Sequence, residues 1–317
     1  MHKVSKDLIA EYRSEIAEHV RLKKAAVDGQ LWMLNAAQPP QQNRDHSAIQ
    51  WILRCHAGTL DKLGSLFDHE GEYRMFELCA IARNLFENLV WLRLMNENTE
   101  YGIVFFHQLL KEQTQHNKAM LQKMQDEAAL FDISETEDTK ILMTTIGALE
   151  ENASPEEITA AQSEHKQKLA ALDARIRQEF CLHARSVVEN GYAYQSYLIK
   201  EETLPKLQER QEVVADHQKK LDAVLQTLLS PKFQQIVKDK WNWFKRAEEV
   251  GMEKHYKFIY SYTSKMLHST ALNIITDKTL AAEEEEVVLE YVLVAARDLI
   301  TQIEKFNYPG QVRVLAI

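Results

Sequence analysis

Two pairs of polar side chains have the types and the spacing of a chemical site. Arg83 and Glu87 lie four residues apart in one hydrophobic run, and Ser264 and His268 lie four apart in a later run rich in tyrosine. Residues four apart share one face of an α-helix. An arginine fork holds a carboxylate or a phosphate by paired hydrogen bonds, and a histidine transfers protons near neutral pH. The chemistry expected of these residues is anion binding with acid–base catalysis.

A functional interpretation gives a role to each of these residues and to their polar and aromatic neighbours. Arg83 would hold a phosphate by its fork geometry, while Glu87 would orient His268 as the acid or base. Ser264 would complete a set of nucleophile, base and orienter. The predicted catalytic residues are Glu87, His268 and Ser264, and the predicted ligand contacts are Arg83, Asn84, Trp91, Tyr260 and Tyr262.

The same pairs also have a structural interpretation. Arg83 and Glu87 would then form an intrahelical ion pair worth a few tenths of a kcal/mol. His268 would be a buried imidazole that is hydrogen-bonded to Ser264 or to another helix. The polar residues would then be an internal network that fixes the register of the helices.

Composition predicts that these residues lie on the helices of an all-α bundle. The chain has only 9 Gly and 6 Pro in 317 residues, which leaves few turns and favours long helices. Apolar residues recur with helical spacing, and the tail 312–317 alternates like a lone strand or an extended edge. Helices are expected at about 5–34, 47–67, 76–95, 104–128 and 252–275, with a last helix that ends at Phe306.

The middle of the chain predicts a long helical arm. Ser154-Pro155 and Glu157 form a helix start, and the helical spacing then continues to about Lys200. A second start at Thr203-Leu204-Pro205 leads to Ser230, so 156–229 is interpreted as a long antiparallel, coiled-coil-like pair. Its charged surface would be solvated or would bind a protein partner. The predicted organisation is 1–150 for the first part of the bundle, 151–230 for the arm and 231–317 for the second part of the bundle.

Three further local predictions concern the arm and the residues before it. Ser134 with Glu137 has the S-x-x-E pattern of a capping box, which predicts that a helix starts there. His183 and His217 in the seam are expected to pack or to hydrogen-bond between helices, since no tight metal-ligand spacing accompanies them.

The net charge and the cysteines indicate which classes of protein fit this sequence. A net charge of −9 argues against broad non-specific binding of nucleic acid, although a local basic groove is compatible with it. The 3 cysteines form no C-x-x-C pair and fit reduced thiols in a cytoplasmic protein. No apolar run predicts a membrane span, and homo-oligomers remain compatible with the sequence. No metal or cofactor is expected, because GxGxxG, Walker A, HExxH and GxSxG motifs are all missing.

Short motifs resemble those of known helical families. R-N-L-F-E at Arg83–Glu87 and Y-S-Y-T-S-K-M-L-H at Tyr260–His268 resemble an uncharacterised all-helical family, a domain of unknown function, over about 74–100 and 256–306. That resemblance implies an all-α bundle in which the Arg-x-x-x-Glu and Tyr-x-x-Ser-x-x-x-His helices lie close together. A weaker similarity is to HEPN-type ribonucleases, whose signature is Arg, four to six residues, then His on one helix. Arg83-Asn84 matches its beginning, but no His follows in that window.

Two functions are compatible with these observations. The first is a polar Arg/Glu/Ser/His pocket that binds or cleaves a phosphate-containing ligand such as RNA or a nucleotide, as in toxin or defence proteins. The second is a non-enzymatic interaction module, in which the arm binds a partner and the polar residues are structural.

Overall fold

Helices make up every element of the part of the chain that the structure describes, which confirms the predicted all-α class. The computed structural model describes residues 3–36, 44–67, 74–267 and 282–306. His268 and the tail 312–317 lie outside these ranges, so the predictions made for them stay predictions.

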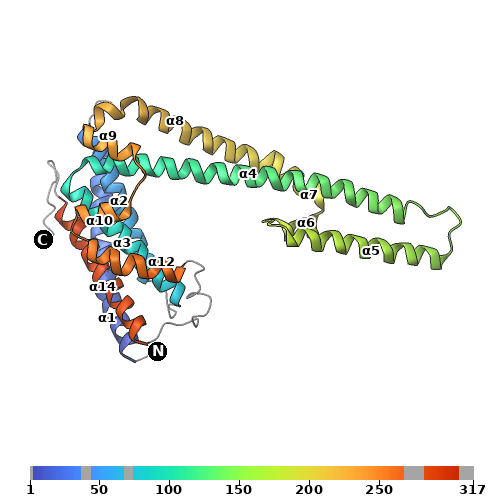
Figure 1. The fold of residues 1–317 in the computed structure, drawn as a ribbon, viewed down its shortest axis with the longest axis horizontal. Coiled ribbons are helices and arrows are strands. Elements are labelled where there is room, and N and C mark those ends of the chain that lie inside the picture. The colour runs from blue at the N-terminus through green and yellow to red at the C-terminus, as the bar shows by residue number, and fades with distance from the viewer. Residues whose placement is uncertain (1–2, 37–43, 68–73, 268–281, 307–317) are drawn as a thin grey trace. The chain divides into compact units, whose positions relative to one another are not determined.

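The chain separates into two compact units (Figure 1). One unit combines 1–108 with 221–317, and the other is 109–220. The first unit contains α1 (Lys3–Ala36), α2 (Arg44–Phe67), α3 (Met75–Glu97), α9 (Pro231–Lys238), α10 (Trp243–Glu249), α11 (Glu253–His255), the π-helix η2 (Tyr256–Tyr260), α12 (Ser261–Leu267) and α14 (Ala282–Lys305). The helices α4 (Glu100–Thr145) and α8 (Leu204–Leu228) each run from one unit into the other.

Helix α3 lies at the centre of the first unit. It packs along α14 and also contacts α2, α10 and α12 (Figure 1). It contacts η2 as well. The helix begins after Arg74, whose backbone N–H donates to the Glu77 carboxylate at 2.8 Å. Its buried side chains are Met75, Leu78, Cys79, Ala82, Leu85, Phe86, Leu89, Val90, Trp91, Leu92, Leu94 and Met95. Fully burying one such large side chain contributes about 1.5–3 kcal/mol, so α3 is a rigid support for the polar groups that it carries.

The helix α4 is longer than the sequence indicates. It continues without a break from Glu100 to Thr145, so the start predicted at Ser134 is wrong. Ser134 is fully buried, and its hydroxyl donates to the Leu130 carbonyl at 2.8 Å, one turn earlier in the same helix. Glu137 bonds Arg175 of a neighbouring helix instead of capping α4. The apolar packing of this segment therefore outweighs the local capping pattern.

The segment from 155 to 228 is more divided than predicted. α5 (Pro155–Gln178) begins with the expected cap, in which the Glu157 carboxylate accepts from the Ser154 N–H at 2.7 Å. It does not continue to Lys200. The short helices α6 (Ala184–Asn190) and α7 (Tyr192–Leu198) and the π-helix η1 (Ile199–Thr203) follow, before α8 starts at Leu204 as predicted. Gly191, between α6 and α7, has a φ of 86°, a left-handed conformation that glycine adopts without steric cost.

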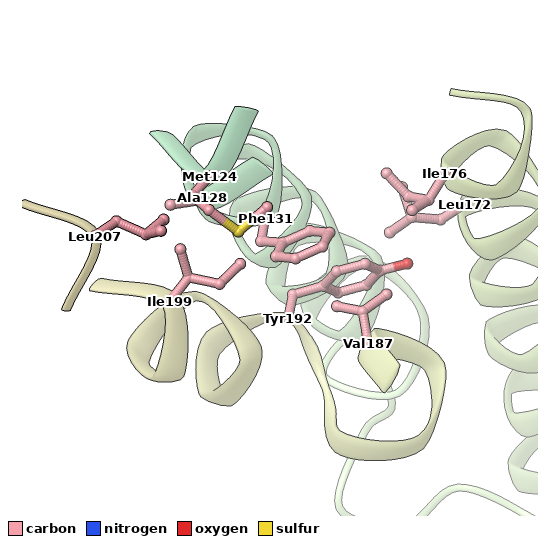
Figure 2. Packing of buried hydrophobic residues seen from close by; sticks show 9 residues of the cluster. All are labelled: Met124, Ala128, Phe131, Leu172, Ile176, Val187, Tyr192, Ile199 and Leu207. Atoms are coloured by element: carbon pink, nitrogen blue, oxygen red, sulfur yellow. The ribbon is translucent and has the colours of Figure 1, made fainter. Parts of the chain in front are cut away.

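A hydrophobic cluster holds the second unit together (Figure 2). Phe131 and Tyr192 lie at its centre, with ring centroids 6.4 Å apart. Side chains from α4, α5, α6, α7, η1 and α8 all contribute to it, so the short helices pack against α4 instead of continuing as one rod. The buried members are Met124, Ala128, Phe131, Leu172, Ile176, Val187, Tyr192, Ile199 and Leu207.

The two seam histidines differ in their surroundings. The His183 ring Nδ1 lies 2.6 Å from the carboxylate of Glu127 on α4, which confirms the expected hydrogen bond between elements. His217 on α8 is exposed, so the packing expected of it is wrong. No helix within the described ranges is long and apolar enough to cross a membrane.

Candidate functional site

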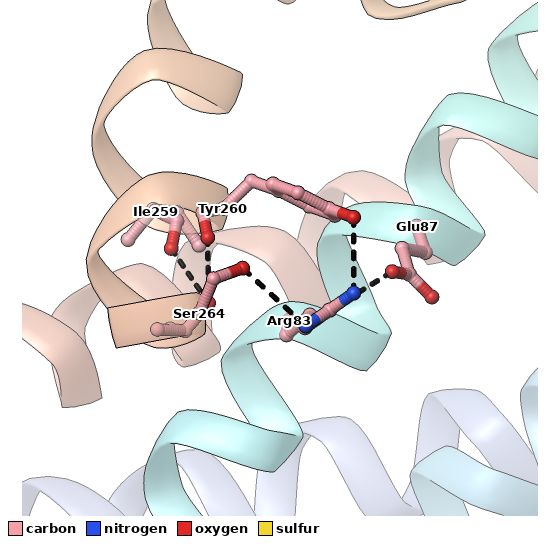
Figure 3. Close-up of polar contacts among 6 residues, drawn as sticks. Arg83, Glu87, Ile259, Tyr260 and Ser264 are labelled. Carbon is pink, nitrogen blue, oxygen red and sulfur yellow. Dashed lines mark hydrogen bonds and ion pairs between the residues drawn. The ribbon is translucent and has the colours of Figure 1, made fainter. Parts of the chain in front are cut away.

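A cluster of polar side chains forms where α3 meets η2 and α12 (Figure 3). The Arg83 Nε donates to Glu87 at 3.1 Å on the same helix. Its Nη2 donates to the Tyr260 hydroxyl at 3.0 Å and its Nη1 to the Ser264 Oγ at 3.3 Å. We call these four residues, Arg83, Glu87, Tyr260 and Ser264, the Arg83 cluster. It joins two segments that lie almost 180 residues apart in the chain.

The π-helix η2 positions the tyrosine of this cluster. Each turn of a π-helix holds more residues than an α-turn, so it changes the direction of the residues that come after it. Tyr256 and Tyr260 stack with ring centroids 4.6 Å apart, and the buried Phe86 ring lies 5.9 Å from Tyr260. Thr263 is fully buried, and its hydroxyl donates back to the Ile259 carbonyl at 2.7 Å. Tyr260 is thus fixed from several sides.

The charges of Arg83 and Glu87 offset each other, and both side chains are partly accessible to solvent. The side chains of Arg83 and Glu87 are 25% and 26% exposed. A guanidinium carries five N–H donors, and three of them point to Glu87, Tyr260 and Ser264, so two make no hydrogen bond with a described residue. Burial raises the pKa of Tyr260, although the positive charge of Arg83 opposes the shift, so this hydroxyl stays protonated near neutral pH.

The other predicted ligand contacts lie in different surroundings. The Asn84 carboxamide oxygen accepts from Asn88 at 3.0 Å along α3. The Tyr262 ring stacks against Phe258, and its buried hydroxyl has no hydrogen-bond partner among the described residues. Burial, followed by the negative charge of Glu284, raises the pKa of Tyr262 to about 12. Neither Asn84 nor Tyr262 therefore takes part in the Arg83 cluster.

Trp91 belongs to an aromatic cluster further along α3. Its side chain is only 7% exposed and stacks on Trp241 with ring centroids 4.2 Å apart. Phe105 and Trp243 approach it edge-on, at 5.3 and 6.4 Å. Trp91 is thus a packing residue in this structure and not a direct contact of the Arg83 cluster.

The sequence interpretation missed two polar groups. In the first unit the Arg246 guanidinium donates to the Tyr101 hydroxyl at 2.9 Å, and Tyr101 also bonds Glu249. In the second unit the carboxylate of Glu127 is almost fully buried. It accepts from the Leu182 backbone N–H and contacts His183 and Lys123. Local spacing could indicate only the Lys123–Glu127 and Arg246–Glu249 pairs. The remaining contacts of each group join segments that lie far apart in sequence, so local spacing gives no signal for them.

No family model matches this chain, and no curated protein or solved structure shows significant similarity to it. The family resemblances of the short motifs therefore stay hypotheses. Within the described ranges, no group of three or more His, Cys, Asp and Glu side chains is arranged to hold a metal ion. The chemistry of the site is thus interpreted from its side chains alone.

Proposed function

We propose that the Arg83 cluster binds a phosphate group of RNA or of a nucleotide. The observation that carries this proposal is a guanidinium that is one-quarter exposed and held by a carboxylate and by two hydroxyls from another segment. Among the described residues, two N–H donors of Arg83 have no acceptor, and the Tyr260 and Ser264 hydroxyls accept from Arg83 without donating their own hydrogens. The cluster therefore offers several donors to the oxygens of one phosphate.

The carboxylate of Glu87 decides whether binding is followed by cleavage. It balances the charge of Arg83, so affinity would come from directed hydrogen bonds more than from net charge. A carboxylate beside a bound phosphodiester can also accept a proton from an attacking hydroxyl, as a general base. Hydrolysis of the probe by the wild-type protein, lost in Glu87→Gln with binding retained, would identify the protein as an RNA-cleaving enzyme.

A binding experiment with a matched control tests the proposal. The probe is a fluorescein-labelled single-stranded oligoribonucleotide of about twelve nucleotides, followed by anisotropy, with AMP as a competitor. We expect Arg83→Gln to weaken binding at least 10-fold, because hydrogen bonds to charged groups contribute about 1.5–3 kcal/mol. The control is Arg93→Gln, since Arg93 lies on the same helix, is 27% exposed and pairs with Asp298. Equal binding by both folded variants would contradict the proposal.

A second candidate function is protein binding through the second unit, and we propose it from a separate observation. Between Phe180 and Tyr197 that unit exposes several large apolar or aromatic side chains, and Phe180 is 79% exposed. A short segment that exposes this many apolar side chains is a candidate interaction surface. The exposed side chains are Phe180, Leu182, Val188, Tyr194 and Tyr197. In this function the Arg83 cluster is structural, and we propose a cytoplasmic location for either function.

Sedimentation velocity tests the simplest partner, which is a second copy of the chain. We expect association that increases with protein concentration and that is lost in the double variant Phe180→Ser/Leu182→Ser. Met143→Ser, a similarly exposed position in the same unit, is the control and should associate like the wild type. A wild-type protein that stays monomeric at all concentrations would contradict self-association.

A further inference from the structure

A concave site lies in the first unit, on the segment that joins α9 to α10. It is a cavity of about 350 Å³, at the lower end of the volumes of ligand pockets. Its lining combines an indole, an amide and three basic side chains. The lining residues are Ile236, Asp239, Lys240, Trp241, Asn242, Lys245 and Arg246. We call it the Trp241 cavity.

The charge of this segment is opposite to that of the chain. Five basic residues and one acidic residue lie between 231 and 246, in a protein whose net charge is −9. Arg246 is engaged with Tyr101 and Glu249. The ammonium groups of Lys240 and Lys245 are exposed and have no hydrogen bond or ion pair within the described ranges. Two lysines beside one cavity form a local site for anions.

Trp241 adds an aromatic ring to the lining of the cavity. Its indole Nε1 is buried and makes no hydrogen bond with any described residue. Its ring is held by Trp91 on one side, and the Arg246 guanidinium lies 5.8 Å from its centroid. The indole ring is thus a fixed aromatic wall beside the basic side chains of the cavity.

Aromatic contacts connect this cavity with the Arg83 cluster. Phe244 contacts Tyr256 at 5.3 Å, and Tyr256 stacks on Tyr260, which bonds Arg83. On α3 itself, Arg83 and Trp91 are eight residues apart, about 12 Å along the helix axis. That distance is several times the spacing of about 3.4 Å between phosphates along one strand. A ligand with a single phosphate therefore cannot place a phosphate at both sites, whereas an oligonucleotide can.

We propose that the Trp241 cavity is a second phosphate-binding subsite for a single-stranded RNA that also occupies the Arg83 cluster. Lys240 and Lys245 bind backbone phosphate oxygens there, beside the ring of Trp241. This inference rests on the proposed function and deepens it, because it makes the ligand an oligonucleotide and not a mononucleotide. Interleaved aromatic and basic side chains are typical of grooves that bind single strands.

The experiment compares two probes on three variants of the full chain. The probes are the labelled twelve-nucleotide RNA and a labelled AMP, both measured by anisotropy over a range of salt concentrations. Each phosphate contact to a single strand contributes a salt slope of about 0.7, so the loss of two contacts weakens binding roughly 25-fold at 0.1 M salt. We expect this loss, and a slope lower by about 1.4, for Lys240→Ala/Lys245→Ala with the RNA only. The control is Lys219→Ala/Lys220→Ala, which removes two lysines from the exposed surface of α8.

The variant Arg83→Gln separates the two proposals. If both stand, it weakens both probes, whereas the Lys240/Lys245 variant weakens the RNA alone. RNA binding that depends on the two lysines but not on Arg83 would overturn the proposed function and keep the cavity as an RNA site. A Lys240/Lys245 variant that binds RNA with the affinity and salt slope of the Lys219/Lys220 control would overturn the cavity proposal, and so would a wild-type protein that binds neither probe.

Discussion

The two units each contain an ion pair in apolar surroundings, and the pairs differ in how completely they are enclosed. In the second unit the Glu127 carboxylate is 1% exposed and is surrounded by the Leu182 N–H, His183 and Lys123. In the first unit the Arg83 side chain is 25% exposed, and two of its N–H donors make no hydrogen bond with a described residue. A buried charge whose hydrogen bonds are all made within the protein affects the stability of the fold. A charge with unused donors at the surface is able to bind a ligand.

The largest expected effect comes from the enclosed pair. Glu127→Ala should lower the free energy of unfolding by about 3 kcal/mol, because it leaves a backbone N–H and two side-chain donors without their acceptor. Urea denaturation followed by circular dichroism measures this change. Glu137→Ala is the control, since its exposed pair with Arg175 should contribute less than about 1 kcal/mol. Similar losses of unfolding free energy in both variants would show that the enclosed pair contributes no more to stability than the exposed pair.

The same carboxylate should make stability depend on pH. Burial alone raises the pKa of Glu127, but the Leu182 N–H, His183 and Lys123 together outweigh it and lower the pKa below its ordinary 4.5. A lowered pKa contributes stability above about pH 4.5, and this contribution is lost as the pH falls through the folded-state value. The stability advantage of wild type over Glu127→Gln should therefore narrow between about pH 6 and pH 3. An advantage that stays constant over this range would show that the charge of Glu127 is not what the donors stabilise.

A smaller effect is expected in the Arg83 cluster, because water can replace the lost partners. Arg83→Gln and Tyr260→Phe should each cost about 1 kcal/mol, and the double variant should deviate from additivity by about 0.5–1.5 kcal/mol. The coupling arises because the guanidinium both bonds the Tyr260 hydroxyl and lies 4.5 Å from the centroid of its ring. Thermal or urea unfolding of the four proteins completes the cycle. Strict additivity would show that the two side chains do not interact in solution.

The smallest effect should come from Ser264→Ala. Its contact with Arg83 is the longest of the three, at 3.3 Å, and water can take its place. We expect a change in stability of less than about 0.5 kcal/mol, but a several-fold loss of affinity for the labelled RNA, because the hydroxyl is proposed as a donor to phosphate. Thr301→Ala, which removes an exposed hydroxyl on α14, is the control for both measurements. Unchanged affinity would remove Ser264 from the ligand site.

The sequence predicted the local parts of this molecule better than the contacts between them. Helical spacing alone is sufficient to predict the Arg83–Glu87 pair and the helix α3 that carries it. The contacts with Tyr260 and Ser264 depend on how distant helices pack, and only the motif resemblance indicated them. The role predicted for Trp91 shows the same limit. Its position on a mixed helix face is compatible with a ligand site, but Trp241, far along the chain, covers it.

Local patterns also failed where packing opposed them. Ser134 and Glu137 have the spacing of a helix start, yet α4 continues through them because Phe131 and its neighbours bury their side chains against α5 and α7. The break at Gly191 was not predicted either, since a single glycine is compatible with the interior of a helix at a cost of about 1 kcal/mol. In both places the tertiary core decides the outcome.

The π-helix η2 makes the Arg83 cluster sensitive to the length of the chain. Each residue added to or removed from a helix rotates the remainder of that helix by about 100°. Deleting one residue between Tyr256 and Tyr260 would allow an α-helical path into α12, and Ser264 would then point away from Arg83. Evolution could gain or lose this cluster by inserting or deleting a single codon, with every residue of the cluster left intact. A homologous chain could carry the same four side chains but lack the residue that makes η2 a π-helix. Its sequence would then match the motif, but the four side chains would not come together.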